Sequence, residues 1–154
     1  MCEVLKEIYR KVYNGPFVYD NLDNRIKLQK AVYLLENMGV DVGDYSFSWN
    51  KYGPYSLGLD SDARNCSMKV EQEVCFSAAA EHGFEKLREY INELIEYNCT
   101  RWMECIASLH FLKNIYRVKE SQLISELEKR KPYLSNKEAN EKALSIAKAI
   151  KVGV

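Results

Sequence analysis

Three neighbouring segments decide the fold of this chain: Lys27-Leu-Gln-Lys-Ala-Val-Tyr-Leu-Leu-Glu36, Tyr45-Ser-Phe-Ser-Trp49 and Lys51-Tyr-Gly-Pro-Tyr-Ser56. In the first, apolar residues recur at the spacing of an amphipathic helix. In the second, aromatic residues alternate with serines, which is typical of a half-buried strand. The third holds Gly53-Pro54, a pair that favours a turn, and ends at Ser56, a residue that caps helices well. The predicted order is helix, strand, aromatic turn and second helix.

The same patterns predict helices through most of the remaining chain. They fall at residues 2–13, 24–38, 98–116 and 120–130, with a short helix from Ser56 to about residue 66, another from residue 79 and a last one opened by Ser135. Residues 98–116 are apolar almost all the way round, which indicates the axis of the core. The segment from Lys69 to Phe76 alternates again, and we expect it to pair with residues 45–49 as a second strand.

The fold class is therefore mainly α (α+β). We expect a compact helical domain of about six to seven helices, with a small two-stranded sheet inserted after the second helix. Either Asn21 or Asp23 is suited to cap the second helix, and Gly39 to end it in a left-handed conformation. Ser135-Asn-Lys-Glu138 has the pattern of a capping box for the last helix.

Length and composition limit the classes of protein to which this chain can belong. A chain of 154 residues predicts one domain, residues 1–154, and 47% apolar residues suffice for a core. Lys and Arg number 22, as do Asp and Glu, so net charge does not favour non-specific binding to nucleic acid. Every apolar run is shorter than the roughly 18 to 20 residues of a membrane span, and the first eight residues lack the features of a signal peptide. We expect a cytoplasmic protein without a membrane segment.

The cysteines and histidines predict no metal site. Five cysteines are scattered along the chain without a Cys-x-x-Cys pair: Cys2, Cys66, Cys75, Cys99 and Cys105. Neither His82 nor His110 lies at ligand spacing from a cysteine. We expect free thiols in a reducing compartment, and no cofactor.

Candidate catalytic groups are few. The acidic residues fall on the predicted solvent faces of helices, which does not favour the facing carboxylates of a glycoside hydrolase. His82 is expected at an exposed helix start, and His110 as a hydrogen-bonded histidine of the core helix. Neither a Gly-x-Gly-x-x-Gly nor a Gly-x-x-x-x-Gly-Lys-Ser/Thr phosphate loop is present. The chain is predicted not to be an enzyme.

The densest chemical feature is aromatic. Tyr45, Phe47 and Trp49 are expected to pack a strand onto the helical core, although aromatics beside Lys27, Lys30 and Lys51 can also stack on bases and meet phosphates. Tyr52 and Tyr55, at a turn, are equally suited to packing or to contact with a partner, because an exposed tyrosine offers a large contact area at low entropic cost.

These motifs resemble a known family. The pattern formed by Lys27–Leu35 and Trp49–Ser56 resembles the YwgA-like family. It is also similar to the wider group of SocA-like antitoxin domains, which are also called Panacea, and to the C-terminal domain of DarG-type antitoxins. Three further pieces agree: Trp102-Met-Glu-Cys-Ile-Ala-Ser-Leu-His-Phe-Leu112, Lys129-Arg-Lys-Pro132 and the Ser135 capping box. The YwgA-like resemblance covers nearly the whole chain, the antitoxin resemblance mainly its first half.

The resemblance implies a helical domain with a small sheet and no known enzymatic activity, and in antitoxin-like members the binding and neutralisation of a partner toxin. Our leading hypothesis is a non-catalytic protein-interaction module of a prokaryotic toxin–antitoxin or defence system. The candidate partner-binding residues are Lys27, Lys30, Trp49, Tyr52, Gly53, Pro54 and Tyr55.

Two alternatives stay open. One is a nucleic-acid-binding regulator with a winged-helix-like surface, since residues 117–151 hold nine Lys or Arg against five Asp or Glu. The other is an enzyme of unrecognised type, which a deep polar pocket around His110 would favour.

Overall fold

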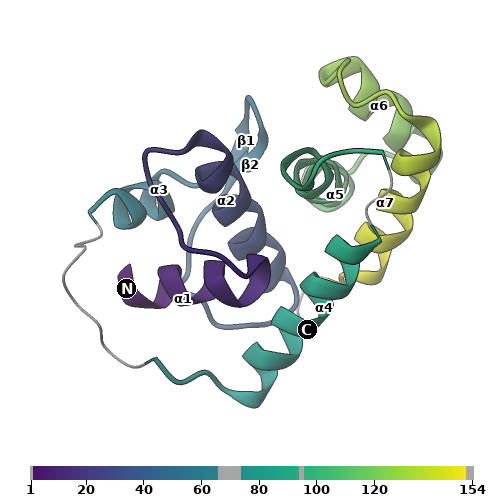
Figure 1. Cartoon of the computed structure of the whole chain (residues 1–154). Coiled ribbons are helices and arrows are strands. Elements are labelled where there is room, and N and C mark those ends of the chain that lie inside the picture. The colour runs from purple at the N-terminus through teal and green to yellow at the C-terminus, as the bar shows by residue number, and fades with distance from the viewer. Residues whose placement is uncertain (1, 66–73, 94–95, 152–154) are drawn as a thin grey trace.

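The computed structural model describes residues 2–65, 74–93 and 96–151. The elements in these ranges are α1 (Cys2–Tyr13), α2 (Leu22–Asn37), β1 (Ser48–Asn50), β2 (Gly53–Tyr55), α3 (Leu57–Arg64), α4 (Ala78–Asn92), α5 (Cys99–Asn114), the 3-10 turn η1 (Glu120–Gln122), α6 (Leu123–Arg130) and α7 (Lys137–Ala149) (Figure 1). The predicted fold class is confirmed: a helical protein with one small two-stranded sheet after its second helix. No helix in these ranges has the length and apolarity to cross a membrane.

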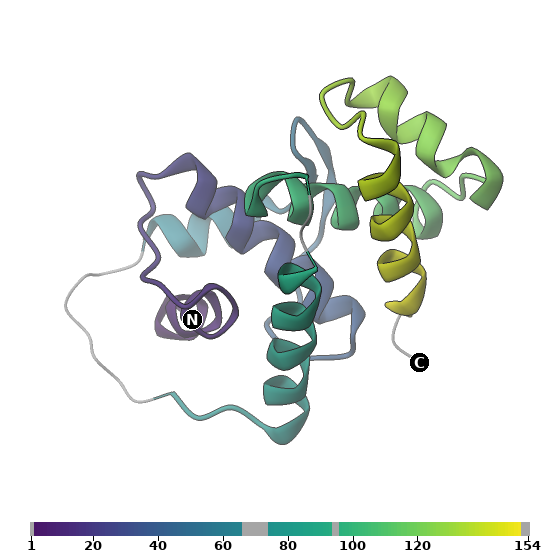
Figure 2. The ribbon, with the colours of Figure 1, turned by 45° about the vertical axis from the view of Figure 1, so that its right-hand side comes forward.

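The helix α5 is the axis of the core, as predicted. All of its residues from Trp102 to Leu112 are buried. It packs against α2, α4, α6, α7 and β2, and Figures 1 and 2 show it between α2 on one side and α7 on the other. Buried apolar residues of all the described α-helices join in one cluster. Each large side chain buried there contributes about 1.5–3 kcal/mol before conformational entropy is subtracted.

The sheet differs from the prediction in its second strand. β1 and β2 form an antiparallel hairpin with Ser48 opposite Tyr55 and Asn50 opposite Gly53. The predicted strand at 69–76 is wrong in its described part, since residues 74–76 are not extended in a sheet, and 69–73 lie outside the described residues. Residues 51 and 52 turn the chain, whereas Gly53-Pro54, predicted as the turn, lies in β2. A short local loop closes at a lower entropic cost than a pairing across an intervening helix.

Local capping chemistry explains where helices begin. The side chains of Asn21 and Ser56 accept the backbone N–H of Asn24 and Leu59, so Asn21 rather than Asp23 caps α2. The cap of α7 is Asn136, which accepts the N–H of Ala139, and the predicted capping box at Ser135 is therefore displaced by one residue. Asn and Ser are about equally good caps, so the sequence pattern alone does not fix the register. Gly39 ends α2 with a φ of +85°, as predicted.

Candidate functional site

Two side chains of α2 hold the hairpin in place. Gln29 donates from Nε2 to the carbonyl of Ser56 at 3.0 Å and accepts the Ser56 N–H on Oε1 at 2.9 Å. Lys30, one residue on, donates from Nζ to the carbonyl of Pro54 at 2.8 Å. The segments Lys27–Leu35 and Trp49–Ser56 are thus joined by side-chain to backbone hydrogen bonds, and all four of these residues are buried.

Gly53 lets the hairpin approach α5 closely. Its φ is +93°, a conformation that favours glycine. A Cβ placed there would lie 2.4 Å from Oγ of Ser108, a contact that no side chain tolerates. The Ser108 hydroxyl itself is buried and has no hydrogen-bond partner among the described residues. Packing between β2 and α5 therefore requires glycine at position 53.

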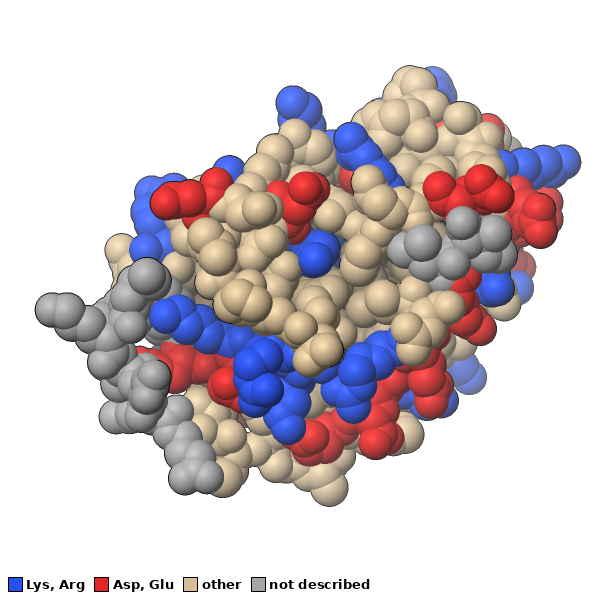
Figure 3. All heavy atoms as spheres, viewed as in Figure 1, with Lys and Arg blue, Asp and Glu red and all other residues tan. Residues whose placement is uncertain are grey.

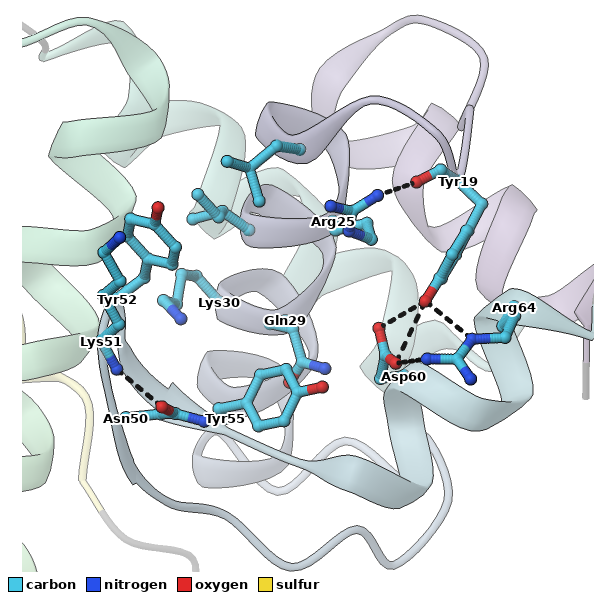
Figure 4. Close-up of a pocket in the computed structure, with 12 residues that line it drawn as sticks. Tyr19, Arg25, Gln29, Lys30, Asn50, Lys51, Tyr52, Tyr55, Asp60 and Arg64 are labelled. Carbon is cyan, nitrogen blue, oxygen red and sulfur yellow. Dashed lines mark hydrogen bonds and ion pairs between the residues drawn. The ribbon is translucent and has the colours of Figure 1, made fainter.

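A pocket of about 530 Å³ opens where α2, the hairpin and α3 meet (Figure 4). Its size falls in the range of small-ligand sites. Polar, aromatic and apolar side chains share the lining: Tyr19, Leu22, Arg25, Ile26, Gln29, Lys30, Asn50, Lys51, Tyr52, Tyr55, Asp60 and Arg64. Figure 4 shows the tyrosines and the long basic side chains arranged around one hollow, with Tyr52 and Tyr55 contributed by the hairpin and Lys30 by α2.

The charge of this pocket is unbalanced. Its basic side chains are Arg25, Lys30, Lys51 and Arg64, and its one carboxylate is Asp60. That carboxylate already accepts the Tyr19 hydroxyl at 3.1 Å and Nη2 of Arg64 at 3.1 Å. The whole chain, by contrast, has no net charge. Positive charge is therefore concentrated in this hollow.

Lys30 is the most constrained of these cations. Its side chain is 1% exposed. Burial, which disfavours the charged form, lowers the pKa of Lys30 from 10.5 to about 7; Glu104 opposes this shift and Lys131 adds to it. Lys30 can therefore exchange its proton near neutral pH, unlike an ordinary surface lysine.

A second ionic cluster, centred on a buried carboxylate, lies behind the hairpin. Glu104 of α5 has no exposed surface, and its carboxylate pairs with Lys131 at 2.9 Å and with Arg101 at 3.0 Å. It also accepts the hydroxyl of Tyr133. Lys131 in turn donates to the carbonyl of Lys51, at the tip of the hairpin, at 2.7 Å. The cluster thus fastens the hairpin to α5 and to the segment after α6.

This cluster corrects one expectation. The prediction that the acidic residues lie on solvent faces of helices is wrong for Glu104, which is buried together with its partner Lys131. The signal in the sequence is a single carboxylate inside the largely apolar run from Trp102 to Leu112. An unpaired charge is too costly in a core, so such a residue implies a buried cation elsewhere in the chain.

The predicted partner-binding residues fall in three places. Lys30, Tyr52 and Tyr55 line the pocket, and Gly53 and Pro54 are buried beneath it. Lys27 is not among the lining residues: its Nζ lies 4.7 Å from the ring centroid of Tyr13, at the contact between α1 and α2.

Trp49 lies outside the pocket and packs with Phe111, beneath the cations Arg130 and Lys131. Tyr45, Phe47 and Trp49 are partly buried against the core while the serines between them are exposed, so their predicted alternation is confirmed.

His110 is a hydrogen-bonded core residue, as predicted. It is fully buried; Nδ1 lies 2.8 Å from the Tyr33 hydroxyl and Nε2 lies 2.9 Å from the carbonyl of Ile150. A neutral ring that donates from Nε2 and accepts at Nδ1 satisfies both contacts. Burial lowers the pKa of His110 below its usual 6.5, which keeps this neutral form. His82 is exposed, at the start of α4.

Within the described ranges, no three His, Cys, Asp or Glu side chains come together as metal ligands. Cys75, Cys99 and Cys105 are free thiols, and burial raises the pKa of Cys99. Compared with family models, with curated proteins and with solved structures, the chain matches none of them.

Proposed function

We propose that this protein is a non-catalytic protein-interaction module, antitoxin-like in that it binds and neutralises a partner protein in a prokaryotic toxin–antitoxin or defence system. One observation carries the proposal. The two segments that resemble antitoxin domains converge on one pocket and are fastened there by Gln29 and Lys30. A pocket built with this rigidity loses little entropy when a partner binds.

The pocket also supplies the residue types that partner proteins use. Tyrosine and arginine are enriched where single residues dominate binding energy, and both occur here, as Tyr52, Tyr55, Arg25 and Arg64. Leu22, which is 45% exposed, adds an apolar contact at the same place.

Co-expression with the neighbouring reading frame of the native host tests the proposal. We expect that frame to be toxic alone, to be neutralised by the full chain, and to co-purify with it at a fixed stoichiometry. A Lys51→Glu variant should neutralise less well, because it reverses an exposed charge of the pocket. Lys137→Glu is the matched control, an exposed lysine on α7, on the other side of α5. Absence of both rescue and a stoichiometric partner would contradict the proposal.

The alternative function, a nucleic-acid-binding regulator, is tested separately from the protein-interaction proposal. Of the basic residues in 117–151, Lys131 is buried, and Arg130 and Lys148 are paired with Glu126 and Glu120. On the face seen in Figure 3, acidic side chains flank the basic ones along the lower part of the surface. A titration with duplex and single-stranded DNA at rising salt tests this alternative, since true binding would weaken steeply with salt.

A further inference from the structure

We infer that the pocket between α2, the hairpin and α3 binds an acidic, partly apolar segment of the partner protein, with carboxylates as the recognised groups. This inference rests on the proposed function and specifies the chemistry of the partner. It is carried by the charge of the lining, by the hydrogen-bond donors left unused in it, and by its apolar edge.

The charge of the lining selects an anion. Four basic side chains and one carboxylate give an excess of three positive charges when Lys30 is protonated, in a chain whose total charge is zero. Because the pocket is concave, its field adds at one place instead of being spread over the surface. A carboxylate placed there gains from several cations at once.

Donors remain available for that carboxylate. In the part of the chain that the structure describes, Arg25 donates only from Nη1, to the carbonyl of Tyr19, and its ring contact is with the same tyrosine. The Lys51 ammonium makes no hydrogen bond or ion pair there, and lies 5.4 Å from the ring centroid of Tyr52. Arg25 can therefore offer Nε and Nη2, and Lys51 its whole ammonium, to a ligand.

The apolar edge selects a peptide. Leu22 and Ile26 lie along one wall, and the rings of Tyr52 and Tyr55 face the hollow from the hairpin in Figure 4. A ligand with carboxylates and one apolar or aromatic side chain fits both kinds of surface. A nucleic acid strand needs cations spaced along its backbone, whereas these four cations line a single concavity.

Lys30 provides a measurable change of protonation when the site is occupied. Its pKa of about 7 reflects burial without a paired carboxylate. A carboxylate that enters the pocket favours the charged ammonium and raises this pKa, so binding at pH 7.5 should take up a fraction of a proton. Calorimetry in two buffers of different ionisation enthalpy measures that uptake.

The probe is a capped pentapeptide, Glu-Glu-Phe-Glu-Glu, titrated into the full chain at low salt. The matched peptide Gln-Gln-Phe-Gln-Gln has the same shape without charge. We expect the glutamate peptide to bind about tenfold more tightly or better, as for a charge-assisted contact, with proton uptake that the glutamine peptide does not cause. Lys51→Glu and Arg25→Gln should each weaken it by about tenfold, and Lys137→Glu should not.

Several outcomes would overturn the inference. The first is equal affinity for the two peptides. The second is an affinity for the glutamate peptide that Lys51→Glu leaves unchanged. The third is binding of single-stranded DNA that is tighter than binding of the glutamate peptide and that Lys51→Glu abolishes. Circular dichroism melts of each variant identify loss of folding, and because Lys51 is exposed its variant should melt like the parent. Peptide binding without rescue of a toxin would contradict only the proposed function. Rescue that Lys51→Glu weakens, together with equal affinity for the two peptides, would contradict only this inference.

Discussion

Lys30 and Lys131 flank the same hairpin and differ in one respect. Both are at least 98% buried, and both donate to a hairpin carbonyl, Lys30 to Pro54 and Lys131 to Lys51. Lys131 also has a carboxylate, Glu104, at 2.9 Å, whereas Lys30 has none within ion-pair distance among the described residues. Burial lowers the pKa of both lysines, and the charge of Glu104 opposes both shifts, but only Lys131 also gains a direct hydrogen bond from that carboxylate.

The comparison separates two uses of a buried cation. In the cluster of Lys131, Glu104, Arg101 and Tyr133, the buried Lys131 has the Glu104 carboxylate as its counter-charge inside the protein, so the cluster has a structural role in fixing the hairpin. Lys30 lines a pocket with surplus positive charge, so we expect an entering anion to supply its counter-charge. We expect the cluster around Glu104 to change little until one of its members is removed. We expect the ionisation of Lys30 to respond to ligand and to pH.

Removal of Glu104 should produce the largest effect. Glu104→Gln leaves Lys131 buried without a counter-charge, and breaking a buried pair in this way costs about 3–5 kcal/mol of the free energy of unfolding. Urea denaturation measures it. Glu126→Gln, which removes the carboxylate partner of Arg130 near the surface, should cost less than about 1 kcal/mol. Equal effects of the two substitutions would mean that the buried cluster has no special structural role.

Substitution of Gly53 comes next. Gly53→Ala places a methyl 2.4 Å from Oγ of Ser108 at a φ of +93°. Strain and overpacking together should cost roughly 2–4 kcal/mol. The same substitution in a Ser108→Gly background should cost clearly less, because the clashing hydroxyl is gone. A cost that is unchanged in that background would place the whole effect in backbone strain.

The titration of Lys30 should give a pH-dependent effect that is smaller over any single pH unit. Its pKa is about 7 in the folded protein and near 10.5 in the unfolded chain, which therefore binds more protons between these values. The free energy of unfolding should rise with pH across that window, by at most about 1.4 kcal/mol per pH unit, and Lys30 should add no slope well below pH 7.

Lys30→Met should remove this slope. The difference in the free energy of unfolding between parent and variant, measured in urea from pH 6 to 9.5, isolates Lys30 from the other titrating groups. A difference that is constant with pH would show that Lys30 titrates like a surface lysine.

Lys27 should show the smallest effect. Its ammonium contacts the rings of Tyr9 and Tyr13, away from the pocket, so Lys27→Met should cost about 0.5–1 kcal/mol of stability. The affinity for the glutamate peptide should stay unchanged. A loss of affinity as large as that of Lys51→Glu would extend the binding surface to the contact between α1 and α2.

The sequence by itself determined the helices, the central position of α5 and the buried state of His110. These follow from local signals, because apolar periodicity and capping side chains act over a single turn of helix. It also predicted Lys30, Tyr52 and Tyr55 as partner-binding residues from the aromatic segment and the adjacent helix, and these three side chains line the pocket.

The tertiary structure alone decided which strand pairs with β1, which lysines are buried and where charge gathers. Strand pairing depends on the cost of loop closure, and Glu104 and Lys131 meet across 27 residues of chain that no local pattern connects. The pocket is likewise formed by residues between Tyr19 and Arg64 that converge only when α2, the hairpin and α3 pack together. Its positive charge is invisible in a composition that sums to zero, because electrostatic fields depend on the arrangement of charges in space.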